Sequence, residues 1–458
     1  MPVYDRGTKS GTAVSRIRAL RDPRDAFAAR LHAAASARRS LDVQYYIWHD
    51  DTSGSLLFKA LLDAADRGVR VRLLIDDNNT EGLDATLSAL RAHPNVEVRV
   101  FNPFVIRRPH WIGYLIDFFR LNHRMHNKSF TADRQITIVG GRNIGDEYFD
   151  APNAAVVFAD LDVMAIGPVA ADVADDFDRY WLSKDSCPIE ALAAPASPAG
   201  VALLSSTLAA VERSPSAMTY LESIRDFIST ISDEPVPVTM ISDDPRKVRG
   251  RAARKTLVIE KIKAIFGDPE ESIDLVSPYF VPGPRGVEVF RRWRERGVKI
   301  RVLTNALEAT DVPAVHAGYA KYRRALLEAG VNLYELRRQS RIRQRKMGVM
   351  GSSSSSLHAK TFAVDGRRTF VGSFNFDPRS ARLNTEMGFV IEDPRMAQQI
   401  ASTFDTTIPA SAYEVHLSDR SNLYWTNEHH RYDREPGVNL RRRVATAIAS
   451  RLPIEWLL

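Results

Sequence analysis

The stretch HNKSFTADRQITIVGGRN, from His126 to Asn143, decides the fold, because its pattern returns as HAKTFAVDGRRTFVGSFN from His358 to Asn375. Both stretches fit HxKx4Dx6GxxN, and all equivalent positions of the two copies keep one constant separation along the chain. If each residue type fills about 5 % of positions, five fixed positions match by chance in roughly one chain of this length in ten thousand. A second copy in register is not chance, so the pattern indicates a duplicated module.

The repetition continues outside these two stretches. SLDVQYY at 40–46 corresponds to SIDLVSP at 272–278 with the same separation as the two motifs. RGVRV at 67–71 corresponds to RGVKI at 296–300 after a small deletion. The duplication therefore extends well beyond the motif, as expected for two similar halves of one fold.

Strands and helices alternate in the first copy. The apolar patterns predict strands at 41–48, 69–75 and 96–101, with helices at 55–67 and 83–92 between them. Such alternation predicts an α/β fold with two pseudo-symmetric halves, each a mixed, mostly parallel sheet flanked by helices. The His and Lys of each motif alternate along a strand, so both side chains project from one face. We expect the halves to place the two motifs in one active site at their interface.

The duplication and the composition divide the chain into five segments. Residues 187–265 are richer in Pro, Ala and Ser than their surroundings, which is typical of a connector. The expected segments are a basic N-terminal segment at 1–35, the first half with its motif at 36–186, the connector at 187–265, the second half with its motif at 266–410, and at 411–458 a C-terminal tail with an amphipathic basic and apolar end.

Composition limits the class of protein. The 458 residues are 44 % hydrophobic and 26 % charged, as in soluble globular proteins, and every apolar run is shorter than a membrane span requires. The N-terminus lacks the apolar core of a secretory signal, and the single Cys187 excludes an internal disulfide and fits a reducing compartment. The net charge of +7 indicates an anionic partner: nucleic acid, an anionic lipid surface or a phosphorylated substrate. Part of this charge lies in a basic run at 337–346, which fits a solvated loop or an anion contact.

The residue types of the motif suit phosphoryl chemistry. Imidazole titrates near neutrality, so one of His126 and His358 can attack a phosphorus centre while the other protonates the departing oxygen. Ammonium and amide groups can supply positive charge and hydrogen bonds to the phosphate oxygens. The motifs provide these groups at Lys128, Lys360, Asn143 and Asn375. This chemistry needs no divalent metal, and the sequence has neither an HExxH motif nor a cysteine cluster, so we expect no metal and no cofactor.

The two motif aspartates allow a second interpretation. Asp133 and Asp365 each stand just before a turn, where an aspartate commonly caps the local backbone. They are therefore candidates for a structural role as well as members of the catalytic motif.

The motif and the sequence around it resemble the phospholipase D superfamily, and within it the bacterial cardiolipin synthases of the C type. The resemblance extends from about residue 24 to the C-terminus and includes long segments outside the motif. It is carried by RMHNKSF, VGGRNIGDEYF, DLDVMAIGP, HAKTFAVDG, VGSFNFDPRSARLNTEMGFVIE and LPIEWLL.

The resemblance implies a role for each motif residue. His126 would be the nucleophile that becomes a phosphohistidine, and His358 would act as acid and then as base. The implied catalytic residues are His126, Lys128, Asp133, His358, Lys360 and Asp365, and the implied phosphate-binding residues are Asn143, Ser373 and Asn375. Asp162 and Glu386 match positions that orient the imidazoles, each reaching the histidine of the other half. The first copy has Gly141 where the second has Ser373, so the two halves need not be equivalent.

The resemblance also implies the reaction. A phosphatidyl group would pass from a donor phospholipid, anionic or zwitterionic, to the primary hydroxyl of phosphatidylglycerol. With water as acceptor, the same chemistry would instead make a phosphodiesterase that hydrolyses phospholipid or nucleic acid, although the chain has no recognisable base-reading module. A non-catalytic membrane-binding protein is a further alternative, which two complete motifs disfavour. The expected partners are these phospholipids and the membrane surface, and an accessory protein would be a further one.

Two segments suit a membrane surface without spanning it. WIGYLIDFF at 111–119 follows Arg107 and Arg108, and aromatic residues beside arginines suit the lipid interface, although the segment also fits a buried core helix. The basic start at 441–443 and the apolar remainder at 444–458 fit an amphipathic anchor or a tail packed on the protein. The expected location is peripheral, on the cytoplasmic face of the bacterial cytoplasmic membrane.

Overall fold

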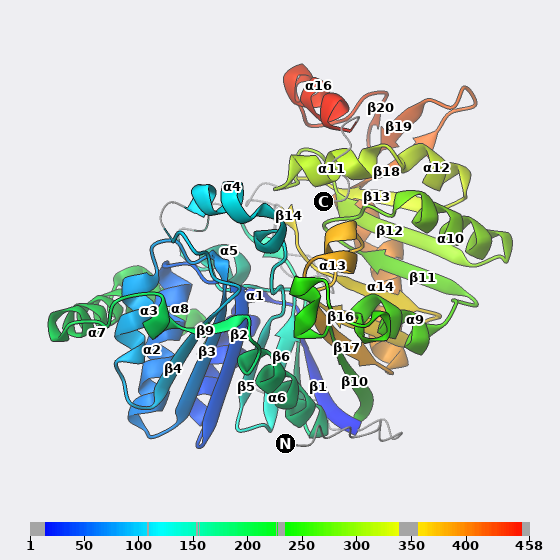
Figure 1. Ribbon diagram of the computed structural model, residues 1–458. Coiled ribbons are helices and arrows are strands. Elements are labelled where there is room, and N and C mark those ends of the chain that lie inside the picture. Colours follow the sequence, from blue (N-terminus) through cyan, green and yellow to red (C-terminus); the bar gives the residue numbers. More distant parts are fainter. Residues whose placement is uncertain are drawn as a thin grey trace.

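The computed structural model describes residues 14–107, 110–152, 154, 156–225, 227, 234–338 and 356–450. Arg108, most of the basic run at 337–346 and the end of the predicted C-terminal anchor, 451–458, lie outside these residues. Two α/β halves lie side by side, the first coloured blue to cyan and the second green to orange (Figure 1).

The described strands form one continuous 18-stranded sheet and one separate two-stranded sheet. The strands of the first half are β1 (Val14–Leu20), β2 (Ser40–Ile47), β3 (Arg70–Asn79), β4 (Val96–Phe101), β5 (Ser129–Ala132), β6 (Ile136–Gly140), β8 (Asp162–Ile166) and β9 (Ser186–Pro188). Those of the second half are β10 (Val236–Ser242), β11 (Ser272–Val276), β12 (Lys299–Asn305), β13 (Asn332–Leu336), β15 (Thr361–Val364), β16 (Arg368–Gly372), β17 (Met387–Ile391), β18 (Ala412–Leu417), β19 (Leu423–Thr426) and β20 (Arg431–Tyr432). The small sheet pairs β7 (Phe158–Ala159) with β14 (Ser356–Leu357).

The strand order shows the relation between the halves. The first half has the order β9-β4-β3-β2-β5-β6-β8-β1. The second half continues it as β10-β17-β16-β15-β11-β12-β13-β18-β19-β20. The antiparallel pair of β1 and β10 joins the two parts, so the order read outward from this pair is similar in both directions.

The predicted α/β fold with two similar halves is confirmed, but within the large sheet parallel pairing is confined to three strands in each half. β2, β3 and β4 are parallel to one another, and so are β11, β12 and β13. The other pairings of the large sheet are antiparallel. They include the hairpins of β5 with β6 and of β15 with β16, which close through tight turns at Asp133 and Asp365, both with a φ of 53°. Each half is therefore a mixed sheet and not a mostly parallel one, since short hairpins add strands without the long crossover that parallel pairing needs.

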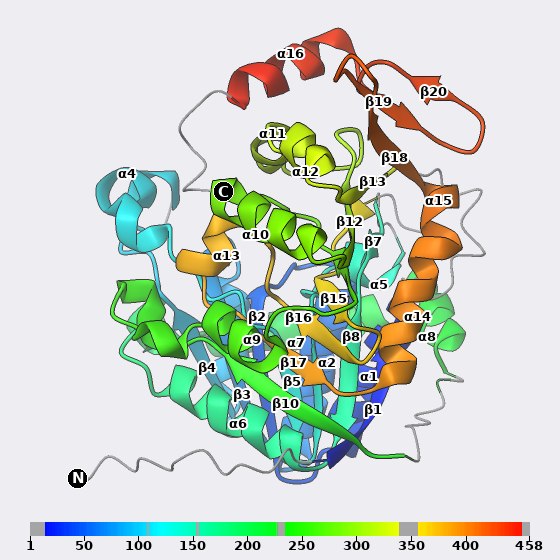
Figure 2. The ribbon, with the colours of Figure 1, turned by 90° about the vertical axis from the view of Figure 1, so that its right-hand side faces the viewer.

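Helices cover both faces of the sheet (Figures 1 and 2). Their bounds are α1 (Pro23–Ser36), α2 (Thr52–Asp66), α3 (Asp84–Arg91), α4 (His110–Leu121), α5 (Asp146–Phe149), α6 (Pro168–Trp181), α7 (Pro198–Glu212), α8 (Pro215–Ser223), α9 (Val258–Phe266), α10 (Gly283–Glu295), α11 (Pro313–Ala320), α12 (Arg323–Glu328), α13 (Pro378–Arg382), α14 (Pro394–Asp405), α15 (Thr407–Ser411) and α16 (Leu440–Ala449).

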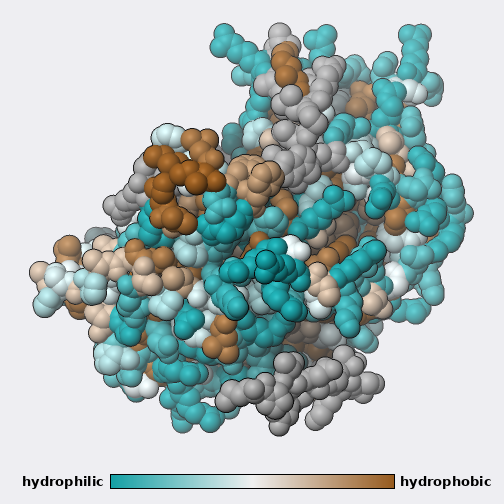
Figure 3. Space-filling view, in the orientation of Figure 1, coloured by the Kyte–Doolittle hydropathy of each residue, from teal (hydrophilic) through white to brown (hydrophobic). Residues whose placement is uncertain are grey.

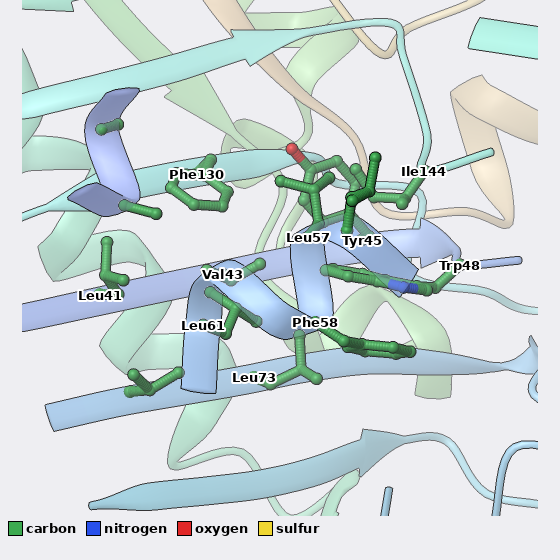
Figure 4. Packing of buried hydrophobic residues seen from close by; sticks show 14 of the residues in the cluster. Leu41, Val43, Tyr45, Trp48, Leu57, Phe58, Leu61, Leu73, Phe130 and Ile144 are labelled. Atoms are coloured by element: carbon green, nitrogen blue, oxygen red, sulfur yellow. The ribbon is translucent and has the colours of Figure 1, made fainter. Parts of the chain in front are cut away.

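The pattern of apolar residues in α2 explains how the core of the first half forms. The side chain of Asp51 accepts the backbone N–H of Gly54 and begins the helix. Leucines and phenylalanine at helical spacing then cover the alternate apolar side chains of β2. Figure 4 shows this packing for Leu57, Phe58 and Leu61 of α2 and Leu41, Val43 and Tyr45 of β2.

A separate apolar cluster lies between the two halves. It combines Val139 and Val163 of the first half with Val371 and Phe389 of the second. These residues come from β6 and β16, which belong to the two motifs, and from β8 and β17, which follow them. The motif strands β6 and β16 and the strands β8 and β17 are thus packed together across the interface.

Two segments outside the predicted halves supply strands to the sheet of the second half. Within 187–265, α7 packs on α2 and α3, and β10 then pairs with β17. Within 411–458, β18 pairs with β13, and α16 packs on α11. Among the described helices, none combines the length and the apolar content that crossing a bilayer requires.

Candidate active site

The strand directions bring the two histidines to equivalent places. β5 runs antiparallel to β2, so His126, which precedes β5, lies at the carboxyl end of β2. His358 precedes β15 in the same way and lies at the carboxyl end of β11. Both side chains are buried, with 7 % and 6 % of their surface exposed for His126 and His358.

The backbone at each histidine is bonded to the opposite half. The N–H of His126 donates to the carbonyl oxygen of Thr385 at 2.9 Å, and the N–H of His358 donates to that of Ala159 at 2.8 Å. The pair of β7 and β14 continues the second of these contacts. The two halves therefore exchange main-chain hydrogen bonds where the histidines lie, which brings the motifs together as predicted.

Each imidazole has a carboxylate partner from the other half. Nδ1 of His126 lies 2.9 Å from Oε2 of Glu386, and Nδ1 of His358 lies 2.6 Å from Oδ2 of Asp160. A carboxylate at this position accepts the Nδ1 proton, which fixes the tautomer and stabilises the imidazolium. The expected contact of Glu386 is present.

The prediction that Asp162 orients an imidazole is wrong. Its carboxylate accepts hydrogen bonds from the Arg30 guanidinium at 2.8 Å and from the backbone N–H of Arg142 at 3.2 Å. The strand register explains the difference, because Gly140 pairs with Asp162 whereas Gly372 pairs with Gly388. The position equivalent to Glu386 is therefore Asp160.

The sequence contains a signal that identifies Asp160. Pro168 and Pro394 begin the helices that follow β8 and β17, so they are equivalent positions of the two halves. Asp160 precedes Pro168 by the same number of positions as Glu386 precedes Pro394. The constant separation of the two motifs no longer applies here, because the loop after the first motif is longer than the loop after the second.

The two motif lysines are buried beside the imidazoles. Nζ of Lys128 donates to the carbonyl oxygen of His126 at 2.7 Å, and Nζ of Lys360 lies 3.1 and 3.3 Å from the two ring nitrogens of His358. Burial lowers the pKa of Lys128 and of Lys360, and the positive charge of Lys360 lowers that of Lys128 further. These two ammonium groups place concentrated positive charge where a phosphate could bind.

The electrostatics of the two imidazole–carboxylate pairs differ. Burial raises the pKa of Glu386 to about 7, although Lys128 and two serine hydroxyls favour its ionised form. Burial also disfavours ionised Asp160, but His358 and Lys360 outweigh it, so the pKa of Asp160 is lowered. Asp160 is consequently a permanent anion at neutral pH, whereas Glu386 titrates there.

The imidazoles follow the same asymmetry. Burial and the nearby charges of Lys128, Lys360 and His358 hold the pKa of His126 well below its usual range. Burial and Lys360 also lower the pKa of His358, but Asp160 opposes this shift. His126 is thus the neutral base of the pair, and His358 has the stronger support for a proton.

The predicted phosphate-binding residues lie at the site but differ in their contacts. Asn143 accepts the backbone N–H of Ile47 at 3.2 Å and donates to the hydroxyl of Tyr148 at 3.0 Å. Ser373 donates to the carboxylate of Glu386. Oδ1 of Asn375 is buried without a hydrogen-bond partner among the described residues. Ser373 thus acts on the imidazole partner, and Asn375 retains an unused polar atom.

The first motif has Gly141 where the second has Ser373, and this difference has a steric cause. A Cβ atom added to Gly141 would lie 2.3 Å from Oδ1 of Asp160. The shorter carboxylate of the first half occupies the space that a side chain at 141 would need, whereas Glu386 leaves room for Ser373. The choice of glycine or serine at this position therefore follows from which carboxylate, Asp160 or Glu386, lies beside it.

Asp133 and Asp365 have the structural role that their turn positions allow. The Asp133 carboxylate accepts backbone N–H groups of Arg38, Arg39 and Ser40 at 2.7 to 2.9 Å. Asp365 accepts those of residues 270 to 272 in the same way. Both lie at the amino ends of β2 and β11, away from the histidines, so their assignment to the catalytic set is wrong.

Several residues at the site carry no motif signal. The ring of Tyr46 lies 5.0 Å from that of His126, and the rings of Tyr148 and Phe158 each lie 5.3 Å from that of His358. They form an aromatic wall around the imidazoles. Periodicity identified Tyr46 only as part of a strand, because an aromatic residue there also suits a buried sheet.

A buried ion pair supports Glu386 from behind. Oδ2 of Asp243 accepts Nζ of Lys247 at 2.8 Å and the backbone N–H of Glu386 at 2.9 Å. Lys247 also donates to the carbonyl oxygen of Ser380, whose hydroxyl donates to Oε1 of Glu386 at 2.7 Å. The predicted connector thus contributes two residues to the site, which composition alone did not indicate.

One group of possible metal ligands occurs among the described residues. His49, Asp51 and Glu147 place ligand atoms within 4.8 Å of one another. Local structure accounts for their contacts, because Asp51 accepts the N–H groups of Gly54 and Asp146 and His49 pairs with Glu147.

Comparison with known proteins agrees with the division of the chain into two similar halves. The family described as "Cardiolipin synthase, PLD-like domain" matches residues 31–181 and 262–408, one match in each half. "Cardiolipin synthase C" of Escherichia coli (strain K12) is 48 % identical over 457 residues, which cover 95 % of this chain and 94 % of that protein. An uncharacterized protein of Helicobacter pylori (strain ATCC 700392 / 26695) is 33 % identical over 83 % of this chain and 77 % of its own.

A solved structure shares the fold. The crystal structure of phosphatidylserine synthase from Haemophilus influenzae Rd KW20 matches with a TM-score of 0.62 and 14 % identity, covering 98 % of each chain. At this identity the likeness concerns the arrangement of the two halves alone. The family match in each half and the relative of nearly equal length agree with the duplicated motif. They show that the chain belongs to the PLD-like family of cardiolipin synthases.

Proposed function

We propose that the protein is a phosphatidyltransferase that makes cardiolipin from a donor phospholipid and phosphatidylglycerol through a phosphohistidine intermediate. One observation carries the proposal: two buried imidazoles, one from each half, are each held at Nδ1 by a carboxylate of the other half. Because Nδ1 is occupied, reaction is directed to the Nε2 atoms. The two buried lysines beside the rings can donate hydrogen bonds to the oxygens of a phosphodiester anion.

The charge asymmetry supports distinct roles for the histidines. In the first step, Nε2 of His126 bonds to phosphorus while the bond from phosphorus to the head-group oxygen breaks, and His358 gives that oxygen a proton. In the second step, the primary hydroxyl of phosphatidylglycerol gives its proton to His358 and bonds to phosphorus as the bond to His126 breaks. Both histidines then return to their initial protonation states.

Burial of the site favours transfer over hydrolysis. The two imidazoles are more than nine-tenths buried, and Tyr46, Tyr148 and Phe158 surround them with aromatic surface. Such surroundings limit the access of water to the intermediate while admitting an alcohol that is presented by a bound lipid.

The substrate class follows from the family and from the relative named Cardiolipin synthase C. The donor would be an anionic or zwitterionic phospholipid, and the acceptor phosphatidylglycerol. Such substrates require contact with a membrane, so we further propose a peripheral location on the cytoplasmic face of the cytoplasmic membrane. An accessory protein fits this scheme but is not needed by it.

Purified protein incubated with vesicles of phosphatidylglycerol and phosphatidylethanolamine tests the proposal. We expect mass spectrometry to detect cardiolipin and a released head-group alcohol, and His126→Ala to abolish both. Phosphatidic acid without cardiolipin would instead identify a phospholipase. Cleavage of plasmid DNA without lipid turnover would identify a nuclease and overturn the proposal.

A further inference from the structure

The helix α4 exposes a group of large apolar side chains. Trp111, Leu115, Ile116 and Phe119 have 62, 75, 71 and 75 % of their surface exposed. In the space-filling view a brown cluster lies at the upper left, over the position of α4 (Figures 1 and 3). We call these four residues the α4 face. Exposed apolar residues gathered in one place mark an interaction site more often than scattered ones do.

The opposite side of α4 is anchored to the first half. Tyr114 packs against Phe104 with ring centroids 5.3 Å apart, and a Cβ atom added to Gly113 would lie 2.7 Å from the Phe104 ring. Before its kink at Asp117 the helix therefore has a fixed inner side, and the exposed Trp111, Leu115 and Ile116 lie before this kink. Phe119 follows the kink and is also exposed. The predicted alternative of a buried core helix is wrong for these four residues.

A chain of contacts leads from α4 to the proposed nucleophile. The Tyr114 hydroxyl donates to Oδ1 of Asn78, and Nδ2 of Asn78 donates to the Tyr46 hydroxyl at 3.0 Å. The Tyr46 ring in turn lies 5.0 Å from that of His126. The position of α4 is thereby tied to the wall of the site.

The α4 face and the C-terminal helix α16 lie at the same end of the molecule. α4 follows the carboxyl end of β4, and α16 packs on α11, which follows the carboxyl end of β12. The two histidines lie at the carboxyl ends of β2 and β11. Both views show α4 and α16 at the upper end (Figures 1 and 2). In α16, Val444 and Ile448 are 48 and 57 % exposed.

We propose that the α4 face inserts into the head-group and upper acyl layer of a phospholipid bilayer and so sets the site at the depth of the lipid phosphates. The choice of a bilayer rests on the proposed function, because a phosphatidyl substrate keeps its acyl chains in the membrane. Aromatic and aliphatic side chains on a short exposed helix suit this interface. The net charge of +7 favours an anionic surface over a neutral one.

Vesicle binding measured without turnover tests the proposal. In a His126→Ala background, sedimentation with 1:1 phosphatidylglycerol and phosphatidylcholine vesicles would compare Trp111→Ser/Ile116→Ser/Phe119→Ser with the unmodified α4 face. We expect binding to weaken at least roughly 30-fold, because three large apolar side chains no longer leave water. Leu182→Ser/Leu203→Ser is the matched control, since these leucines are 76 and 67 % exposed outside α4 and should change binding less than about 2-fold.

Tryptophan fluorescence provides a second measurement of whether α4 contacts lipid. Vesicles of brominated lipids should quench the tryptophan emission of the protein, and Trp111→Phe should remove most of this quenching. Circular dichroism would show that the serine variants remain folded.

The outcomes separate this proposal from the proposed function. Normal vesicle binding by the serine variant would overturn the α4 proposal even if cardiolipin is made. Loss of a dimer in sedimentation velocity without lipid, with vesicle binding unchanged, would assign the α4 face to a second copy of the chain. Absence of cardiolipin synthesis with α4-dependent binding would overturn the proposed function and leave the bilayer contact.

Discussion

The two halves share a fold and a motif, yet they hold their imidazoles in different ways. His126 faces Glu386, whose pKa burial raises to about 7, whereas His358 faces Asp160, whose pKa is lowered by His358 and Lys360 against the effect of burial. Duplication thus supplied two equal imidazoles, and the carboxylates of the opposite half made them unequal. A nucleophile that must be neutral and an acid that must carry a proton require this kind of difference.

The largest expected effect comes from removing either imidazole. His126→Ala and His358→Ala should each lower phosphatidyl transfer from a natural donor by about 10⁴-fold or more, because each removes a reacting group. A donor with a nitrophenol head group sharpens the comparison, since this leaving group needs no proton. His358→Ala should then release a burst of nitrophenolate, and His126→Ala should not. A burst in His126→Ala alone would reverse the two roles.

A smaller effect is expected at the aspartate beside His358. Asp160→Asn should lower the rate of transfer by roughly 10² to 10³-fold, because the amide cannot stabilise the imidazolium. Asp162→Asn is the control on the same segment, with its carboxylate bound to Arg30 and Arg142. It should lower thermal stability and leave the nitrophenyl burst and the pH profile unchanged. Equal pH profiles for both variants would contradict the assignment of Asp160.

Glu386 should limit activity at low pH. Only the ionised carboxylate accepts the Nδ1 proton of His126, so transfer should rise with pH through about 7, the raised pKa of Glu386. Glu386→Gln should lower the rate by roughly 10²-fold and remove this rise from the pH profile. An unchanged acidic limb in Glu386→Gln would assign that limb to another group.

The same residue should couple activity to stability. Below its ordinary pKa of 4.5 Glu386 is protonated in both states, and between pH 4.5 and about 7 only the unfolded state loses the proton. Stability therefore declines over this range, and above it the loss is complete. The free energy of unfolding of Glu386→Gln, measured relative to the wild type, should therefore increase by up to about 3 kcal/mol from pH 4.5 to pH 8. Urea denaturation at both pH values measures the gain, and an equal difference at the two would contradict it.

The smallest effect on activity is expected at the motif aspartates. Asp133→Ala and Asp365→Ala each leave three backbone N–H groups without their carboxylate, which should cost about 1 to 2 kcal/mol of unfolding free energy. The turnover number of the folded variants should stay within about 2-fold of wild type, because neither carboxylate touches the site. A loss near that of Asp160→Asn would return them to the catalytic set.

The sequence predicted the parts of the site that repeat. The paired motif identified His126, His358 and their lysines, and its spacing led to two similar halves. The role of Asp160 was not predicted, because the loops after the two motifs differ in length. The constant separation of the motifs therefore does not relate Asp160 to Glu386. The roles of Asp243 and Lys247 were not predicted, because these residues lie in a segment without a repeat. They come close to Glu386 only through the pairing of β10 with β17. Long-range strand pairing of this kind leaves no local pattern.

The position of the intermediate tests the central claim most directly. Wild-type protein mixed with a donor phospholipid, stopped within milliseconds by denaturant at neutral pH and digested, would be analysed by tandem mass spectrometry. A phosphatidyl group on the peptide that contains His126 is the predicted result. A phosphatidyl group on the peptide that contains His358, or on neither histidine during rapid turnover, would contradict the assignment of His126 as the neutral nucleophile and His358 as the proton donor.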